Sequence, residues 1–281
     1  MKILQILVLA VVQGAAELLP VSSSAHVIVT GKLMGLDPTH PEMTFLLVML
    51  HTGTMFAVLI YFWPRWKAWF RPEFRFQAAK YLFVATAATG VVGFGLKEAI
   101  EHFFLGGEHA EIESLFGRMP LMAAALFSVG LLIIYSGTRE NTSVSASINT
   151  KQSLIIGIVQ GLCLPFRGFS RSGATISAGL LQGVSRPIAE DFSFALAVVL
   201  TPPVIVREWL RLWKAAPRDM VQQLGIGHLL TDGLVGMVFS FGAGLLALRW
   251  LSSWLEKGRW KYFGYYCLAA SLGVLLLSFF K

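Results

Sequence analysis

A carboxylate and an amide lie four residues apart near the beginning of the chain, in the run QGAAE at positions 13–17. Residues four apart share one face of a helix, so Gln13 and Glu17 would lie together. An ionisable residue within an apolar segment is costly to bury and is usually functional. Oxygen ligands of this kind suit a hard divalent cation such as Mg²⁺ or Ca²⁺. Gln13 and Glu17 are therefore candidate metal ligands, and the alternative is a polar pair that only packs between helices.

Three serines and a histidine follow in the run LPVSSSAH, positions 19–26. Serine at the start of a helix is commonly an N-cap, which is the alternative role for Ser22 and Ser24. Ser23 and His26 are three residues apart and could form a nucleophile and base pair. The free amides of a helix N-terminus attract phosphate, which makes Ser22 a candidate phosphate ligand.

An arginine lies among hydroxyls in the run GFSRSGAT, positions 168–175. The guanidinium group is always charged and offers a bidentate fork, so an arginine in an apolar segment is expected to pair with a carboxylate or a phosphate. Arg171 is therefore a candidate phosphate ligand, together with Ser170, Ser172 and Thr175. The alternative for Arg171 is a side chain that extends its charged end to the membrane–water interface.

The composition places the elements that carry these residues in a membrane. Of the 281 residues, 55% are hydrophobic and 14% are charged, whereas soluble domains have about 25% charged residues. We expect one integral membrane domain, residues 1–281, whose first segment is retained rather than cleaved as a signal. The net charge of +7 indicates basic loops that orient the chain and contact membrane lipids, so nucleic-acid binding is not expected.

Apolar runs between charged residues, prolines and glycines predict ten helical segments. They are roughly 3–19, 24–36, 44–62, 79–104, 119–136, 153–164, 172–184, 191–206, 224–248 and 262–280. A spanning helix needs roughly 20 mostly apolar residues, and segments 1, 2, 6 and 7 are shorter than that. The sequence therefore predicts an all-α polytopic membrane protein with six spanning helices.

An internal repeat relates the two halves of the chain, about 1–140 and 150–281. LVLAVVQG, which ends at Gly14, resembles LIIGIVQG, which ends at Gly161, and each is followed by a proline and a serine-rich turn. Further along, Thr52 matches Thr201 at an offset of 149. A register kept across several segments indicates a duplicated fold of the kind found in transporters.

The short segments predict two re-entrant helical hairpins, formed by segments 1 and 2 and by segments 6 and 7. Irregular backbone at membrane depth must be buried in protein or line a wet cavity, so we expect the two turns to meet near mid-membrane. Three spanning helices per half make the second repeat inverted relative to the first. The two serine-rich turns would then approach from opposite sides and form one composite site.

These two motifs resemble the signature regions of the bacterial undecaprenyl-diphosphate phosphatases, also known for bacitracin resistance. The likeness lies in ELLPVSSSAH with its lead-in from Gln13 to Glu17, and in GFSRSGATIS, positions 168–177. It covers essentially the whole chain, including the arrangement in ten segments and two halves. Two positions depart from the family: Gln13, where a glutamate is common, and Arg167-Gly168, where Pro-Gly is usual.

The resemblance implies hydrolysis of a long-chain polyprenyl diphosphate, with a divalent cation, in the bacterial cytoplasmic (inner) membrane. It implies that Glu17 and Gln13 hold Mg²⁺ or Ca²⁺, that Ser23 and His26 are catalytic, and that Arg171 binds phosphate with its neighbouring hydroxyls. Attack by Ser23 and attack by a metal-bound water are both open. A homodimer is compatible with the sequence. The competing function is a transporter or flippase for a polyprenyl phosphate or a small anion.

Charged loops predict the orientation. The connection between segments 3 and 4 has five basic residues against one acidic residue, Glu73, and should be cytoplasmic by the positive-inside rule. The basic residues are Arg65, Lys67, Arg71, Arg75 and Lys80. The next connection is acidic, with Glu101, Glu108, Glu111 and Glu113 against Arg118. The first hairpin then enters from the extracytoplasmic face and the site opens to that face, although Arg207, Arg211, Lys214 and Arg218 would lie on the outer side.

Other polar residues in apolar segments have less specific signals. His51 and Asp232 could each be a partner of a functional residue, but a hydrogen-bonded packing role is the favoured interpretation of both. Cys163 and Cys267 lie in apolar segments, where a thiol behaves as a small hydrophobe. No role is assigned to either cysteine.

Overall fold

The computed structural model describes residues 1–36, 41–103, 115, 118–139, 145, 147–215 and 226–279. These residues form ten α-helices, one short 3-10 helix and one isolated β-bridge between Ser145 and Val184. The helices are α1 (Ile3–Leu18), α2 (Ser23–Leu33), α3 (Pro41–Trp66), η1 (Lys67–Phe70), α4 (Arg75–Phe103), α5 (Met119–Thr138), α6 (Thr150–Cys163), α7 (Arg171–Leu181), α8 (Arg186–Ala215), α10 (Ile226–Glu256) and α11 (Trp260–Phe279).

Six of these helices, α3, α4, α5, α8, α10 and α11, are long and apolar enough to cross a membrane. The expected all-α fold with six candidate spans is therefore confirmed. Several helices extend beyond their predicted segments, because the sequence prediction ended segments at charged residues. For example, α3 continues through Pro64 to Trp66, and α10 continues to Glu256.

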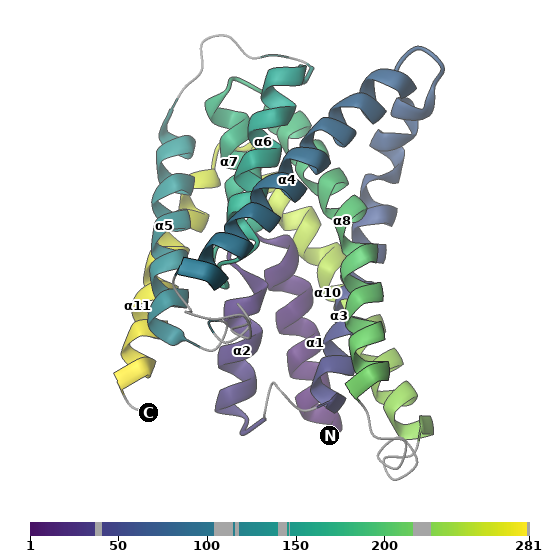
Figure 1. Ribbon diagram of the computed structural model, residues 1–281, viewed down its shortest axis with the longest axis vertical. Coiled ribbons are helices and arrows are strands. Elements are labelled where there is room, and N and C mark those ends of the chain that lie inside the picture. The colour runs from purple at the N-terminus through teal and green to yellow at the C-terminus, as the bar shows by residue number, and fades with distance from the viewer. Residues whose placement is uncertain are drawn as a thin grey trace.

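The four short helices form two hairpins. Figure 1 shows α1 and α2 in the lower half of the molecule and α6 and α7 in the upper half, with their turns near mid-height and both chain termini at the lower end. The helix α1 ends just before Pro20, which cannot continue its hydrogen-bond ladder. The helix α7 begins at a serine cap, because the Ser170 Oγ accepts a hydrogen bond from the Gly173 amide at 3.2 Å.

The glycine at the end of each VQG sequence permits a close helix crossing. A Cβ atom on Gly14 of α1 would lie 2.5 Å from the carbonyl oxygen of Ser240 in α10. A Cβ atom on Gly161 of α6 would lie 2.9 Å from the carbonyl oxygen of Thr89 in α4. The two halves thus use the same residue type for equivalent crossings, α1 with α10 and α6 with α4. Small residues allow such close approach of backbones in membrane proteins.

An ion-pair cluster joins α3 to α8 and was not predicted from the sequence. The Arg65 Nη1 donates to Asp191 Oδ1 at 2.7 Å and to Glu190 Oε2 at 3.0 Å. Glu190 is buried and also accepts a hydrogen bond from Ser252 of α10. Because Arg65 pairs within the protein, it is not a free loop charge. Of the residues used to predict orientation, Glu108, Glu111, Glu113 and Arg218 lie outside the described residues.

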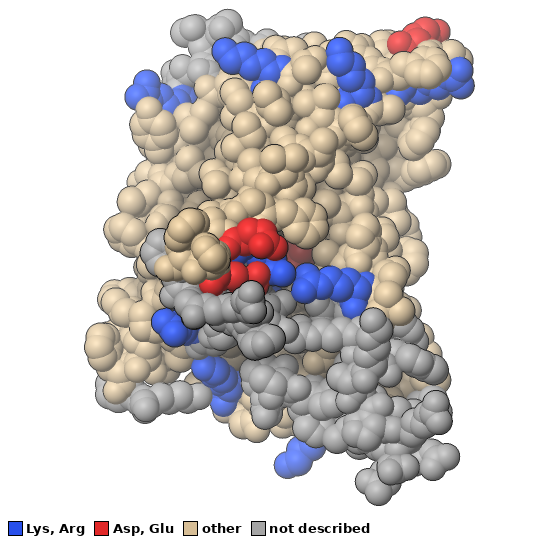
Figure 2. Space-filling model, viewed as in Figure 1, with Lys and Arg blue, Asp and Glu red and all other residues tan. Residues whose placement is uncertain are grey.

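The exposed charges gather away from the apolar surface. Figure 2 shows Lys and Arg residues and an acidic patch along the upper rim, and a broad uncharged band beneath them. It also shows a group of charged residues near mid-height beside the lower end of α4, with further Lys and Arg residues below it. The upper rim includes the connection from η1 to α4 and the start of α8, where the Arg186 Nη1 donates to the carbonyl oxygen of Glu256 at 3.4 Å. An uncharged band of this kind is the surface that lipid requires.

The packing of α6 against α4 gives a matched pair of glycine substitutions. A Cβ atom on Gly157 would lie 2.3 Å from the Ala85 carbonyl oxygen, whereas nothing lies within 4 Å of one on Gly95. We expect Gly157→Ala to destabilise the protein by roughly 1–3 kcal/mol, because the helices must move apart. Gly95→Ala should be neutral or stabilising by up to about 1 kcal/mol. Thermal unfolding in detergent measures both, and equal melting temperatures would contradict the close crossing.

Candidate active site between two hairpin turns

The Glu17 carboxylate connects the two hairpins. Its Oε1 atom accepts a hydrogen bond from the Arg171 Nη2 at 3.1 Å, so α1 of the first half is paired with α7 of the second. Its Oε2 atom accepts from the Ser23 Oγ at 2.5 Å and from the Gln13 Nε2 at 3.2 Å. The composite site predicted from the sequence repeat therefore brings Glu17, Arg171, Ser23 and Gln13 together.

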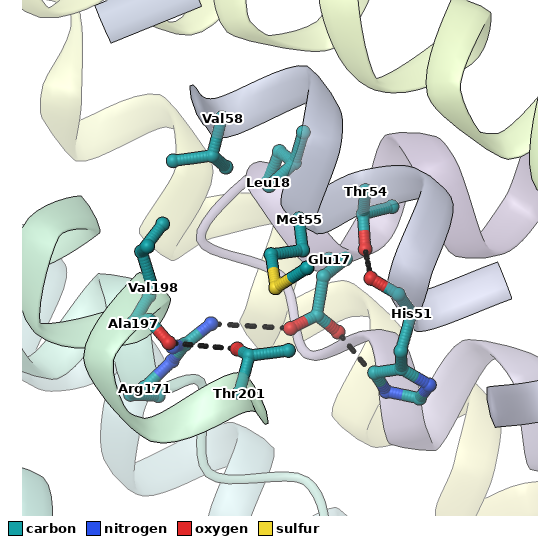
Figure 3. Close-up of a pocket in the computed structure, with 10 residues that line it drawn as sticks. All are labelled: Glu17, Leu18, His51, Thr54, Met55, Val58, Arg171, Ala197, Val198 and Thr201. Carbon is teal, nitrogen blue, oxygen red and sulfur yellow. Dashed lines mark hydrogen bonds and ion pairs between the residues drawn. The ribbon is translucent and has the colours of Figure 1, made fainter. Parts of the chain in front are cut away.

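A pocket lies beside this carboxylate, between α1, α3, α7 and α8. Figure 3 shows Glu17 between Arg171 on one side and His51 on the other. The His51 Nε2 lies 3.7 Å from the Glu17 Oε2, and the side chains of Glu17 and Arg171 are 17% and 21% exposed. The remaining lining residues are mostly apolar: Leu18, Thr54, Met55, Val58, Ala197, Val198 and Thr201. The pocket thus combines a charged end with an apolar wall.

Ser23 and His26 have different partners in the structure. The hydroxyl of Ser23 donates to Glu17, as given above. The His26 Nδ1 is 2.8 Å from the carbonyl oxygen of Ser22, and its Nε2 is 2.6 Å from the hydroxyl of Tyr266 in α11. Because a carbonyl only accepts, Nδ1 carries the proton in this bond, and Nε2 is engaged by the Tyr266 hydroxyl. The acceptor beside Ser23 in this arrangement is therefore Glu17.

Ser22 has an unusual backbone conformation at the start of α2. Its φ angle is 69°, and it is the one non-glycine residue with a positive φ among the described residues. Such a conformation costs on the order of 1–3 kcal/mol and persists only where neighbours enforce it. Here the Ser22 carbonyl accepts from both the ring and the backbone amide of His26. The buried Ser22 hydroxyl is 3.3 Å from the Ser24 Oγ.

The hydroxyls of the second turn do not line the pocket and form hydrogen bonds within the protein instead. Ser170, Ser172 and Thr175 are buried. Ser170 caps α7, and its Oγ is 3.4 Å from the Ser172 Oγ. Thr175 donates to the Arg171 carbonyl oxygen at 2.9 Å, and its hydroxyl is 2.5 Å from that of Ser193 in α8. Their direct contact with phosphate stays a prediction.

The turns contact each other through Gly168. Its amide donates to the Ser24 Oγ at 3.4 Å. Its φ angle is 101°, and an added Cβ would lie 2.5 Å from the Met122 carbonyl oxygen. Glycine is needed here for both reasons, and the position before it is Arg167, where the family usually has proline.

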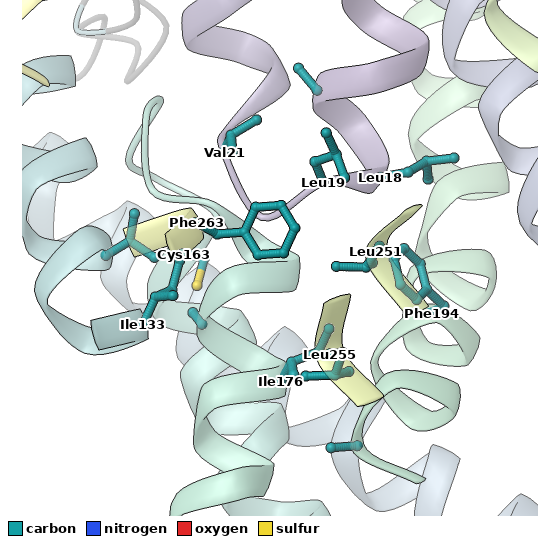
Figure 4. Packing of buried hydrophobic residues seen from close by; sticks show 14 of the residues in the cluster. Leu18, Leu19, Val21, Ile133, Cys163, Ile176, Phe194, Leu251, Leu255 and Phe263 are labelled. Atoms are coloured by element: carbon teal, nitrogen blue, oxygen red, sulfur yellow. The ribbon is translucent and has the colours of Figure 1, made fainter. Parts of the chain in front are cut away.

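Apolar side chains hold both turns in place. Figure 4 shows Leu18, Leu19 and Val21 of the first turn in one cluster with Phe194, Leu251 and Phe263. Cys163 and Cys267 are buried in the same cluster as free thiols. Interiors pack to near-crystalline density, so this cluster fixes the height at which Glu17 and Arg171 meet.

Of the two polar residues that were given a packing role, His51 lines the pocket. No sequence motif identified it, because it lies on α3, 34 positions after Glu17, and its place depends on tertiary packing. Asp232, the other residue, does not line the pocket, and its Oδ2 is 3.6 Å from the N-terminal nitrogen of Met1.

The residues at the pocket can hold a divalent cation only if phosphate or water completes its coordination shell. The described residues contain no group of three or more histidine, cysteine or acidic side chains suited to a metal. Glu17 supplies a carboxylate, Ser23 a hydroxyl, and Gln13 an amide whose oxygen would face the site after the amide turns over. Such a set fits a cation like Mg²⁺, which commonly uses one or two carboxylates and completes its shell with phosphate and water.

The sequence of this chain is similar to a known protein family and to several named proteins. The family described as bacitracin resistance protein BacA matches residues 6–273. Undecaprenyl-diphosphatase 2 of Acinetobacter baylyi is 57% identical, with 99% of each chain covered. Proteins named undecaprenyl-diphosphatase from Rhodopirellula baltica and Parabacteroides distasonis are 29% and 31% identical, covering 99% and 98% of this chain and 98% of each relative. The chain belongs to the bacitracin resistance protein BacA family.

Proposed function

We propose that this protein hydrolyses undecaprenyl diphosphate to undecaprenyl phosphate and inorganic phosphate, which recycles the lipid carrier of cell-wall synthesis. The observation that carries the proposal is the Ser23–Glu17–Arg171 contact at the meeting point of two hairpin turns in a helical membrane protein. An anion-binding arginine, a hydroxyl and its acceptor are the parts that phosphoryl transfer requires. The names of the relatives agree with this activity.

In the proposed mechanism Arg171 binds the terminal phosphate and Ser23 attacks its phosphorus. The Oγ–P bond forms, the P–O bond to undecaprenyl phosphate breaks, and the Ser23 proton moves to the oxygen that leaves with undecaprenyl phosphate. Water then attacks the phosphoserine, inorganic phosphate leaves, and Ser23 recovers its proton. The N-terminal amides of α2 and α7 can donate to phosphate oxygens. A catalytic role for His26 at Ser23 requires its Nε2 to leave Tyr266. Direct attack by water, with Ser23 as a ligand, is the alternative route.

A divalent cation, Mg²⁺ or Ca²⁺, is part of the proposal. Glu17 would be its charged ligand, and Gln13 would contribute an amide oxygen. When bound, the cation would neutralise part of the negative charge of the diphosphate, and Arg171 would neutralise another part.

The proposed membrane arrangement is one domain of two inverted repeats, each with one re-entrant hairpin. The antiparallel pairs support it: Gly130 of α5 lies against Gly264 of α11, and Gly137 lies against Lys261 earlier in α11. The equivalent crossings of α1 with α10 and of α6 with α4 support it as well. The opposite approach of the two hairpins in Figure 1 is what an inverted repeat requires.

We propose that the upper end in Figure 1 is cytoplasmic and that the protein resides in the bacterial inner membrane with its site opening to the extracytoplasmic side. Besides the α3–α4 connection, three further connections share the upper end in Figures 1 and 2 and are basic. Their basic residues are Arg139, Lys151, Arg186, Lys257 and Arg259. Positively charged short loops favour the cytoplasm.

Ser23→Ala tests the nucleophile. We expect the variant to fold but to lose at least about three orders of magnitude of turnover, because loss of a nucleophile removes the covalent step. The measurement is phosphate release from undecaprenyl diphosphate in detergent, together with detection of phosphoserine in wild-type protein quenched during turnover. Retention of more than about a tenth of the activity would exclude Ser23 as the nucleophile.

Arg171→Lys tests the phosphate contact. Lysine keeps the charge but lacks the planar fork, so we expect a loss of at least about tenfold in kcat/KM with normal folding. Arg139→Lys, on the exposed end of α5, is the matched control and should keep full activity. Equal kinetics for both variants would show that a point charge suffices at position 171.

Cysteine labelling tests the orientation. In a background without Cys163 and Cys267, Glu73→Cys should resist a membrane-impermeant thiol reagent in intact cells, because the exposed turn before α4 is predicted to be cytoplasmic. Lys2→Cys, exposed at the opposite end, should be labelled. The reverse pattern would place the site on the cytoplasmic side.

A further inference from the structure

We propose that His51 is a ligand of the divalent cation at Glu17 and binds it through Nε2. The inference rests on the proposed function, because the diphosphate of the substrate would complete the coordination shell. It assigns chemistry to a residue that no sequence motif identified.

The ring of His51 is fixed in the orientation of a metal ligand. Its Nδ1 is 2.7 Å from the carbonyl oxygen of Leu47, one turn earlier on α3. Since a carbonyl only accepts, Nδ1 is the donor in this bond, and Nε2 is the ring nitrogen that a metal could bind. Histidines that bind metals almost always donate their other nitrogen to a carbonyl or carboxylate in this way.

The Nε2 atom faces the Glu17 oxygen that Arg171 does not hold. It is 3.7 Å from the Glu17 Oε2, and both side chains line the pocket. Two ligand atoms at about 2.1 Å from one ion, at right angles to each other, lie about 3 Å apart. A small rotation of either side chain would bring this pair, which a dashed line joins in Figure 3, to that spacing.

The two oxygens of Glu17 have separate partners. Oε1 is held by the Arg171 guanidinium at 3.1 Å, while Ser23, Gln13 and His51 all approach Oε2. A cation at Oε2 would therefore be on the side of the carboxylate away from Arg171. Phosphate oxygens between the cation and Arg171 would offset the repulsion between the two positive charges.

The two histidines differ in the partners of their ring nitrogens. Both ring nitrogens of His26 are engaged, with Ser22 and with Tyr266. His51 keeps Nε2 toward the pocket, with a side chain 36% exposed. Imidazole is a poor ligand for Ca²⁺, which takes oxygen ligands, whereas Mn²⁺ accepts both nitrogen and oxygen. The competing explanation of the contact is an ion pair between a protonated His51 and Glu17 with no metal.

Pulsed electron paramagnetic resonance of Mn²⁺ distinguishes these explanations. The sample is the full chain in detergent with Mn²⁺, with and without methylenediphosphonate, a diphosphate that is not hydrolysed. We expect echo modulation from one directly bound ¹⁴N nucleus, and its replacement by the ¹⁵N pattern in protein made with labelled histidine. Wild-type protein that binds no Mn²⁺ under either condition, or binds it without a nitrogen signal, would overturn the proposal.

Variants identify the ligand. His51→Asn, which can keep a donor to Leu47, should lose the nitrogen signal and bind Mn²⁺ at least about tenfold more weakly. His51→Gln should do the same, and provides a second variant if the first does not fold. His102→Gln, at the end of α4 and outside the pocket lining, is the control. It should keep the nitrogen signal and the wild-type affinity for Mn²⁺. A nitrogen signal that persists in a folded His51 variant would exclude His51.

Activity is measured separately in the same preparations, as phosphate release from undecaprenyl diphosphate. Active wild-type protein without a nitrogen signal would overturn the role of His51 and leave the phosphatase intact. Wild-type protein that shows the nitrogen signal but no phosphate release would overturn the proposed function and leave the metal ligand intact.

Discussion

The ion pair between Glu17 and Arg171 is the contact on which the site depends. Each residue belongs to a different half of the chain, and each is more than three-quarters shielded from solvent. A charge in an apolar environment is stable only when it is paired and hydrogen-bonded. The pair therefore requires both turns at the same depth, which in turn requires short hairpins, close glycine crossings and an apolar cluster around the turns.

The duplicated framework carries chemistry that is not duplicated. Ser23 and Arg171 are each the first residue of the second helix in their hairpin, and Glu17 corresponds to Leu164 by the register of the VQG sequences. The first half thus supplies the Glu17 carboxylate and the Ser23 hydroxyl, and the second half supplies the Arg171 guanidinium. Ser22 has a strained φ of 69°, whereas its counterpart Ser170 has an ordinary value of −64°. Strain confined to the half with the hydroxyl is typical of functional sites.

The sequence predicted the helices, the two short hairpins and the meeting of Glu17 with Arg171. Hydrophobic period, proline placement and the internal repeat can all be read from the sequence without knowledge of tertiary packing. It could not predict contacts that depend on how α3 and α8 cross. His51 reaches the pocket, and Arg65 pairs with Glu190 and Asp191, only through that packing. The expected partnership of Ser23 with His26 relied on spacing alone, and the strained turn at Ser22 directs the imidazole to Tyr266 instead.

The crossing of α3 and α8 also bears on the direction from which a phosphate can arrive. Along this contact the pocket residues Val58 and Ala197 are followed toward the upper end by the stacked rings of Phe62 and Phe194, 5.0 Å apart, and then by the Arg65 ion pair. A diphosphate coming from above along this contact would have to separate the rings and break a pair whose acidic partner Glu190 is buried. Both steps are costly for a hydrated anion. This layering favours access from the lower end, where α1 and α2 lie. It agrees with the orientation that we propose from the basic connections at the upper rim.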